Sequence, residues 1–189
     1  MITRDEAFAL LKEHNTEINL INHALESEAV MRGLAAKLGQ DEELWGLTGL
    51  LHDLDYSVTK EVHDRHGLDS VDIIGDKLPQ EALAAIRRHA YDMNGSEAPG
   101  TEFDFALRCG ETVTGLVHAG ALVRPTKIDG MKVKSLKKKM KDKAFAASVN
   151  RDCIRECDKI GLELGEFLTI AIASIKDIAP EVGLSADPA

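Results

Sequence analysis

The chain has 189 residues, of which 44% are hydrophobic and 4% aromatic, and its formal net charge is −9. This length suits one domain with a full hydrophobic core, and the acidic balance argues against an overall basic nucleic-acid-binding surface. The apolar stretch at 167–178 is too short to span a membrane, and the N-terminus is too charged for a signal peptide. The three cysteines, an odd number, fit a reducing environment, so we expect a cytoplasmic protein without a membrane partner.

Hydrophobic periodicity predicts an all-α fold. Because aromatic residues are scarce, the core must consist mainly of Leu, Ile, Val and Ala, which favours helices, and no alternation typical of strands persists. Helices are expected at residues 3–14, 16–38, 41–52, 64–77, 79–89, 102–123, 133–141, 144–160 and 164–178. The stretch 91–101 is expected to be irregular and could serve as a lid or only as a connection.

Several helix ends are marked by local signals. Thr3 and Glu6 have the spacing of a capping box, and Asp41 is a natural N-cap. Gly39 and Gly161 are expected to end the helices that precede them.

The dipeptide His52-Asp53 ends an apolar helical run and indicates a metal-binding site. Leucines at helical spacing lead up to it, so the pair should lie where a buried helix ends and water is scarce. An imidazole nitrogen and a carboxylate oxygen together suit divalent first-row metals. His23 lies upstream and His66 and His89 lie downstream, and these neighbours strengthen an otherwise weak signal.

His23 is expected to point inward. At about 100 degrees per residue, a helix over 16–38 places His23 on one stripe with Ser27, Val30 and Leu34, at the edge of the apolar face. A hydrogen-bonded core histidine without a metal is the alternative reading.

The pattern resembles the HD-domain superfamily of metal-dependent phosphohydrolases, whose signature is a histidine, a His-Asp pair and a later acidic residue. His23 and His52-Asp53 match it. Further strings are similar to small stand-alone bacterial HD proteins of the HDIG type: LLHDLDY at 50–56, RHGLDSVDIIG at 65–75, AIRRHA at 85–90 and KAFAA at 143–147. The resemblance implies a single-domain HD-type helical bundle over 1–189, with the metal-site core at about 16–123 and a C-terminal helical extension at about 124–180.

The resemblance places Glu111 at the final ligand position, three residues before Thr114-Gly115, where the family normally has aspartate. The extra methylene moves the carboxylate by about 1.5 Å, so Glu111 could bind directly, bind through water or fail to bind. Asp104, about two helical turns earlier, is an alternative ligand. His118, on the same predicted helix, is expected to be a packed core residue.

In two-metal members of the superfamily, a histidine near a glycine and another at the end of the following helix bind a second ion. His66-Gly67 and His89 fit that pattern. One ion would then use His23, His52, Asp53 and Glu111, and the other His66, His89 and a bridging Asp53. Without a second ion, His66 would be a neighbour of a helix cap and His89 a charge at a helix C-terminus. The expected cofactor is divalent Mn, Co, Ni, Zn or Fe, as one ion or two.

The segment 127–143 contains eight lysines and only two acidic residues. Arg124, Lys127, Lys134 and Lys138 could bind the phosphate of a substrate. A solvated helix face is the alternative, and nucleic-acid binding is disfavoured because no aromatic stacking residues lie nearby.

The resemblance implies hydrolysis of a small phosphorylated substrate, such as a nucleotide, by a metal-activated water. Asp53 is the central ligand, and Asp55 is a second candidate catalytic residue that could hold a water or a histidine. Two alternatives are a di-iron oxygenase on the same scaffold and a non-catalytic nucleotide-binding or metal-binding regulatory module. The C-terminal helices could also pair in a homo-oligomer.

Overall fold

The computed structural model describes residues 1–186, and within them every regular element is a helix. The all-α prediction is therefore confirmed. The α-helices are α1 (Arg4–His14), α2 (Ile18–Leu38), α3 (Glu42–Leu51), α4 (Tyr56–Thr59), α5 (Leu68–Ile74), α6 (Gln80–His89), α7 (Tyr91–Asn94), α8 (Glu102–Leu122), α9 (Val133–Lys139), α10 (Arg151–Arg155) and α11 (Leu164–Asp177). The 3-10 helices are η1 (His63–Arg65), η2 (Gly75–Lys77) and η3 (Glu156–Ile160).

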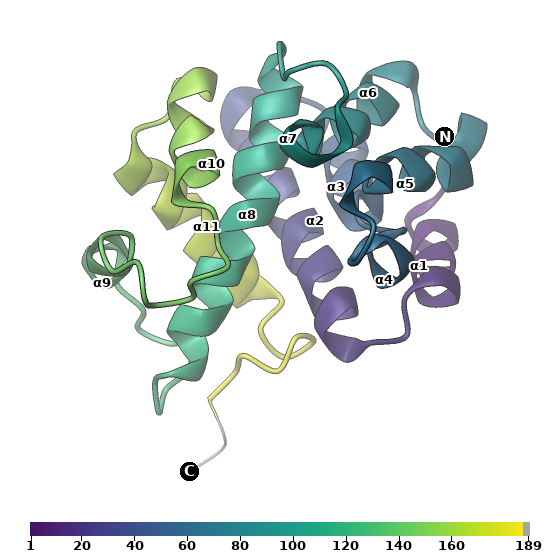
Figure 1. Cartoon of the computed structure of the whole chain (residues 1–189). Coiled ribbons are helices and arrows are strands. Elements are labelled where there is room, and N and C mark those ends of the chain that lie inside the picture. The colour runs from purple at the N-terminus through teal and green to yellow at the C-terminus, as the bar shows by residue number, and fades with distance from the viewer. Residues whose placement is uncertain (187–189) are drawn as a thin grey trace.

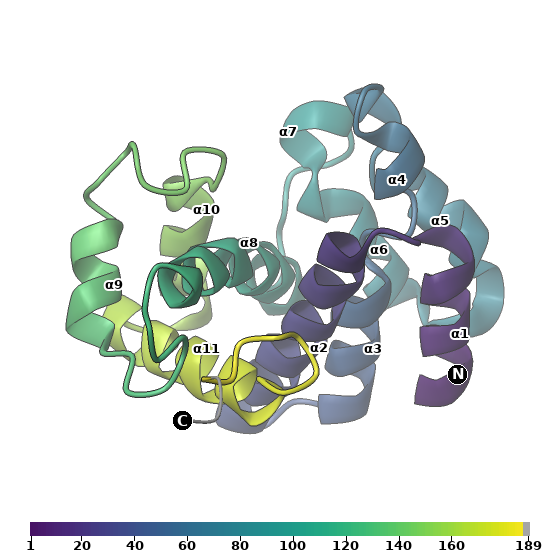
Figure 2. The same ribbon diagram turned by 90° about the horizontal axis from the view of Figure 1, so that it is seen from below.

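Two long helices, α2 and α8, cross in the middle of the molecule (Figure 1). Helix α3 packs along α2, and α6 packs along α8. Viewed from below, α9 and α10 lie on one side of α8, and α1, α4 and α5 lie on the other (Figure 2). The buried hydrophobic residues form one continuous cluster from Ala7 in α1 to Leu184 near the end of the described chain. The expected boundary between core and extension near residue 124 stays a prediction.

The helix ends follow the local signals in the sequence. Thr3 and Glu6 form the capping box at the start of α1. The Asp41 carboxylate accepts the backbone N–H groups of two residues in the first turn of α3. Gly39 ends α2 in the left-handed conformation with φ of 69°. These predictions are confirmed. Each signal depends only on neighbouring residues, so it could be read directly from the sequence.

The helix predicted at 64–77 is wrong in its first part. The chain forms η1 and restarts only at Leu68, because Gly67 adopts a φ of 78°. A Cβ atom at position 67 would lie 2.9 Å from the carbonyl oxygen of Ile86 and 3.0 Å from the ring of His89. Glycine therefore lets this turn pack directly against the end of α6, beside His89.

The helix predicted at 144–160 is also wrong in its first part. Helix α10 begins at Arg151, because the Asn150 side chain accepts the backbone N–H groups of its first turn. The Arg151 guanidinium donates to the carbonyl groups of Phe145, Ala146 and Val149, which a continuous helix would have used internally. Within 91–101, expected to be irregular, the first four residues form the short helix α7.

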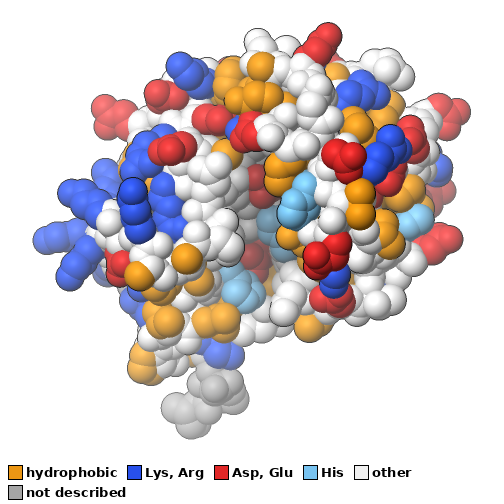
Figure 3. Space-filling model, in the orientation of Figure 1, with side chains coloured by type: hydrophobic (Ala, Val, Ile, Leu, Met, Phe, Trp, Pro, Cys, Tyr) orange, Lys and Arg blue, Asp and Glu red, His pale blue; other side chains and the backbone are white. Residues whose placement is uncertain are grey.

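Charge is distributed unevenly over the surface. Lysine and arginine side chains gather at the edge of the molecule where α9 lies, although the whole chain has a net charge of −9 (Figure 3). Histidine side chains line the hollow in the middle of the same face (Figure 3). The basic surface and the histidines are thus separate features. Among the described residues, no helix is both long and apolar enough to cross a bilayer.

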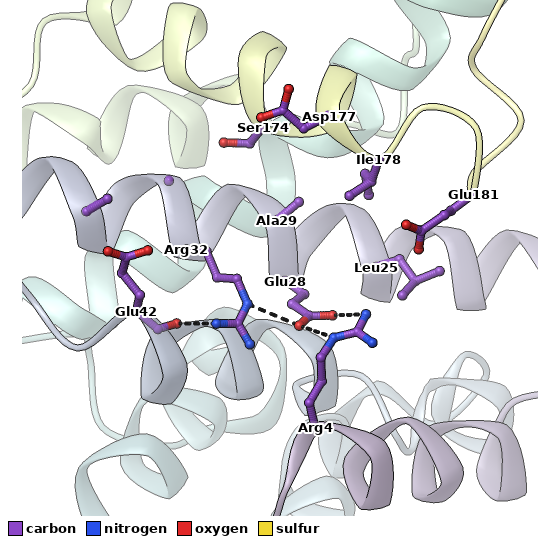
Figure 4. Close-up of a pocket in the computed structure, with 12 residues that line it drawn as sticks. Arg4, Leu25, Glu28, Ala29, Arg32, Glu42, Ser174, Asp177, Ile178 and Glu181 are labelled. Atoms are coloured by element: carbon purple, nitrogen blue, oxygen red, sulfur yellow. Dashed lines mark hydrogen bonds and ion pairs between the residues drawn. The ribbon is translucent and has the colours of Figure 1, made fainter.

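A groove between α2 and α11 contains a buried carboxylate that joins two helices (Figure 4). Glu28 on α2 accepts from Arg4 Nε at 2.7 Å and from Arg4 Nη2 at 2.9 Å. It also accepts from Arg32 Nε at 3.2 Å. This network holds the N-terminal helix α1 against α2. Both helices also pack against α3.

We expect Glu28→Gln to destabilise the fold. The new amide NH2 would face guanidinium donors, so at least one charge-assisted hydrogen bond is lost. Because Arg4 is 42% exposed, the loss is about 1–3 kcal/mol rather than that of a fully buried pair. Urea unfolding measures it, with the exposed Glu13→Gln on α1 as the control. Equal unfolding midpoints for the two variants would contradict the prediction.

Candidate metal centre

Four histidines from four different segments meet at Asp53. His23 lies within α2, and His52 follows the last residue of α3. His66 follows η1, and His89 is the last residue of α6. The structure therefore brings together residues that are up to 66 positions apart, since 89 minus 23 is 66.

The Nε2 atoms of all four histidines lie close to the Asp53 carboxylate. Asp53 Oδ1 lies 3.2 Å from His52 Nε2, 3.5 Å from His66 Nε2 and 3.3 Å from His89 Nε2. Asp53 Oδ2 lies 3.6 Å from His23 Nε2. The Nε2 atoms of His23 and His52 are 3.3 Å apart, and those of His66 and His89 are 3.2 Å apart.

The opposite ring nitrogen of each histidine is held by a hydrogen-bond acceptor. His52 Nδ1 donates to the Gly49 carbonyl at 2.8 Å, and His89 Nδ1 donates to the Ile86 carbonyl at 2.6 Å. These acceptors assign the proton to Nδ1 and leave a lone pair on Nε2.

The other two histidines are assigned in the same way. His66 Nδ1 donates to Asp55 Oδ1 at 2.9 Å. His23 Nδ1 lies 2.9 Å from Thr114 Oγ1, and this hydroxyl donates its own proton to the Glu111 carbonyl. Thr114 is therefore an acceptor for His23, and all four Nε2 lone pairs point at one carboxylate.

Lone pairs that converge in this way repel one another unless a positive charge lies between them. Asp53 Oδ1 is buried and has no hydrogen-bond partner within the described part of the chain. Burial lowers the pKa of His52 to about 3, so this ring is neutral and cannot supply the charge. Although burial opposes it, the neighbouring imidazoles hold the pKa of Asp53 well below its usual range. A bound cation fits the donor set.

Within the described residues, the ligand atoms form two groups that share Asp53. The first group contains His23, His52 and Asp53, and the second contains Asp53, His66 and His89. In each group the ligand atoms lie within 4.8 Å of one another. Imidazole and carboxylate ligands suit Mn, Fe, Co, Ni or Zn. Each of the two overlapping groups could hold a metal ion.

Glu111 lies at the edge of the first group. Its Oε2 is 3.8 Å from His23 Nε2, and its other oxygen accepts from the Thr112 hydroxyl. Burial, reinforced by the charge of Asp53, raises the pKa of Glu111 to about 8. Asp104, the alternative ligand, instead caps the start of α8 and accepts from Arg88. The structure thus brings Glu111, and not Asp104, to the histidines.

Asp55 lies behind the centre rather than in it. Its side chain is fully buried, with Oδ1 accepting from His66 Nδ1 and Oδ2 accepting from the backbone N–H groups of Gly67 at 2.6 Å and Ser70 at 3.0 Å. Both oxygens are therefore occupied by protein donors. This geometry differs from a catalytic group that touches substrate, and it supports a role in orienting His66.

The centre forms the floor of a cavity of about 600 Å³. Sequence reasoning missed one important wall residue, Arg108, which is buried on α8. Its guanidinium donates to Glu156 at 2.8 and 3.0 Å, to Asp92 at 3.3 Å and to the His89 carbonyl. Arg108 thus ties the end of α6 to α8 and η3. An arginine in the middle of an apolar helix face was the available signal.

The basic residues predicted to bind substrate lie elsewhere. Arg124 donates to the carbonyl groups of its own turn at Lys127 and Asp129, and Lys127 Nζ donates to the Gly183 carbonyl. Lys134 and Lys138 are exposed on α9. The structure does not place these four among the residues that line the cavity. Their role in substrate binding stays a prediction.

The described residues form an all-helical fold, and Asp53 of the His-Asp pair belongs to both groups of candidate metal ligands. These features indicate a helical protein that binds metal. The chain belongs to the HD domain family, whose model matches residues 20–142. This family is part of the metal-dependent phosphohydrolase superfamily, and its members bind divalent metals. The resemblance inferred from the sequence is confirmed.

Two curated relatives are named ribonuclease Y. The protein from Protochlamydia amoebophila (strain UWE25) is 35% identical over 78 residues, which are 40% of this chain and 15% of the relative. The protein from Acholeplasma laidlawii (strain PG-8A) is 32% identical over 75 residues, which are 39% of this chain and 14% of the relative. The matched part is thus a small share of these relatives. No solved structure matches the chain significantly.

Proposed function

We propose that the protein hydrolyses a phosphate ester at a centre of two divalent metal ions bridged by Asp53. The observation that carries this proposal is the convergence of four histidine Nε2 atoms on Asp53 at the floor of an open cavity. The first ion would be held by His23, His52 and Asp53, with Glu111 beside it, and the second by His66, His89 and Asp53.

Bound divalent ions would polarise a phosphoryl oxygen and lower the pKa of a water molecule towards neutrality. The chain's own residues keep the ligands in place. Leu50, Leu51 and Leu54 are essentially inaccessible to solvent and exclude water behind His52-Asp53. Asp55 orients His66, and Arg108 holds the backbone of His89.

Among the described residues that line the cavity, no arginine or lysine is unpaired and able to neutralise the substrate. Of the lining residues, the only one of these two types is Arg108, and its guanidinium is already paired with Glu156 and Asp92. We therefore expect the phosphate that reacts to be bound through the metal centre itself. Because the relatives carry the name ribonuclease, phosphodiesters belong in the substrate tests beside phosphomonoesters.

Metal analysis tests the two-ion arrangement. We expect close to two divalent ions per wild-type chain and close to one in His89→Gln, because only the second ligand group loses a member. His63→Gln, on an exposed histidine, should retain two. Elemental analysis of protein purified without chelator measures the content. One ion in both wild type and His89→Gln would contradict the bridged centre.

Activity is then tested with p-nitrophenyl phosphate, bis(p-nitrophenyl) phosphate and a panel of nucleotides. Hydrolysis that disappears with chelator and returns with the native metal supports the proposal. The shared Asp53 also fits the two irons that an oxygenase would need. If the protein contains two irons, consumes oxygen and releases no phosphate, the di-iron oxygenase is the correct function and phosphate-ester hydrolysis is not.

A further inference from the structure

A second cavity adjoins the metal centre on the far side of His23. It has a volume of about 330 Å³ and lies between α2 and α8. His23 and Gly115 line both this cavity and the one above the metal centre. We call it the α2–α8 groove, and its lining residues are Asn19, His23, Glu26, Thr114, Gly115, His118, Ala119 and Leu122.

Two histidine bridges join α2 to α8 along this groove. The first runs from His23 Nδ1 to Thr114 Oγ1 over 2.9 Å and belongs to the metal centre. The second runs from His118 Nδ1 to Glu26 Oε1 over 2.6 Å. Thr114 and His118 are four residues apart on α8, so the second bridge lies about one helical turn, or 6 Å, from the first.

The His118–Glu26 bridge is a charge-assisted hydrogen bond in which the His118 imidazole donates to the Glu26 carboxylate. The Glu26 side chain is only 2% exposed, and a carboxylate so deeply buried needs a charged partner. Its hydrogen bond raises the pKa of His118 and so favours the imidazolium form. The His118 side chain is 27% exposed, which differs from the packed core position expected from the sequence.

The free edge of His118 faces an open space. Its Nδ1 is used by Glu26, while Nε2 has no hydrogen-bond partner in the part of the chain that the structure describes. Asn19 adds an exposed side-chain amide to the same wall. The groove therefore presents N–H donors on the far side of His23 from the metal ligands, and the hydrogen bond to Glu26 keeps the His118 imidazole in place.

We propose that the α2–α8 groove binds a second anionic group of the substrate through His118 Nε2. The substrate would then carry two negatively charged groups, one at the metal centre and one beyond the His23–Thr114 bridge, at His118, which lies about one helical turn further along α8. This inference rests on the proposed function, because the metal centre supplies the first binding point. His118 is a specificity-determining residue in this view and does not contact the reacting atoms.

The test is calorimetric titration of manganese-loaded protein. The probes are methylphosphonate, which has one anionic group, and alkane bisphosphonates with one, three or five methylene groups between the phosphorus atoms. At least one bisphosphonate should bind about tenfold or more tightly than methylphosphonate, since a charge-assisted hydrogen bond is added. In His118→Gln this gain should vanish, while metal content and methylphosphonate affinity stay unchanged. His63→Gln should keep the gain.

Each other outcome overturns the inference in an identifiable way. If no bisphosphonate binds more tightly than methylphosphonate, or if the gain persists in His118→Gln, the groove is not an anion subsite and the proposed function stands. If the wild type binds neither metal nor methylphosphonate, both proposals fail. Should His118→Gln not fold, as judged by circular dichroism, Glu26→Gln takes its place. Because Glu26 holds His118, this substitution must reduce the difference in affinity between the bisphosphonate and methylphosphonate.

Discussion

Replacing Asp53 with asparagine is expected to remove bound metal and to reduce hydrolysis to the rate of the protein-free reaction. Asp53 belongs to both ligand groups, so its loss affects both ions together. Asparagine offers one neutral oxygen in place of two charged ones, and its NH2 group cannot coordinate a cation. Among the described residues, no other carboxylate is placed to bridge the histidines, because Glu111 lies 3.8 Å from His23 and Asp55 accepts from His66.

Metal analysis and thermal unfolding measure this effect independently of any substrate. At a metal concentration about 1,000 times the dissociation constant, binding stabilises the wild type by about 4 kcal/mol. Asp53→Asn should show no such gain. Asp72→Asn makes the same change on a side chain that is 76% exposed, and it should behave like the wild type. Retention of full metal content and activity in Asp53→Asn would rule out the proposed centre.

Asp55→Asn should selectively weaken the second ion, by about 10–100-fold in affinity. The Asp55 carboxylate accepts from His66 Nδ1 on one oxygen and from the backbone of Gly67 and Ser70 on the other. An amide can satisfy only one of these sides. If the amide NH2 faces the backbone, it meets the N–H donors of Gly67 and Ser70 and no hydrogen bond forms. If the NH2 faces His66, the ring must move its proton from Nδ1 to Nε2, and the lone pair that would bind metal is lost.

Metal titration distinguishes the two ions. The first group, formed by His23, His52 and Asp53, is untouched by this substitution, so one ion should still bind with wild-type affinity. Thr48→Val serves as the control for a buried polar change, since among the described residues the Thr48 hydroxyl hydrogen-bonds only to the Leu44 carbonyl. Equal affinities of Asp55→Asn and the wild type for the second ion would show that Asp55 does not orient His66.

Local sequence features determined several helix ends and the His-Asp pair of the metal site. Thr3, Asp41 and Gly39 mark helix ends through contacts with immediate neighbours, and the structure agrees. His52-Asp53 could be recognised because the two residues are adjacent and end an apolar helical run. The resemblance to HD domains then pointed to His23, His66 and His89, all of which reach Asp53.

Two helix predictions failed where periodicity continued through a break. Gly67 interrupts one helix because the end of α6 leaves no room for a Cβ atom at that position. The segment before Asn150 is held out of a helix by Arg151, which takes up its carbonyl groups. Hydrophobic spacing along one helix contains no information about such contacts.

Only the tertiary structure decided what lies around the ligands. It placed Arg108 in the cavity wall and the predicted phosphate-binding lysines outside it. It also turned Asp55 towards His66 and set His118 against the buried Glu26. Sequence periodicity specifies which face of a helix is apolar, but these contacts depend on how far apart and at what angle helices pack. That geometry comes from side-chain packing in the shared core of α2, α3, α6 and α8.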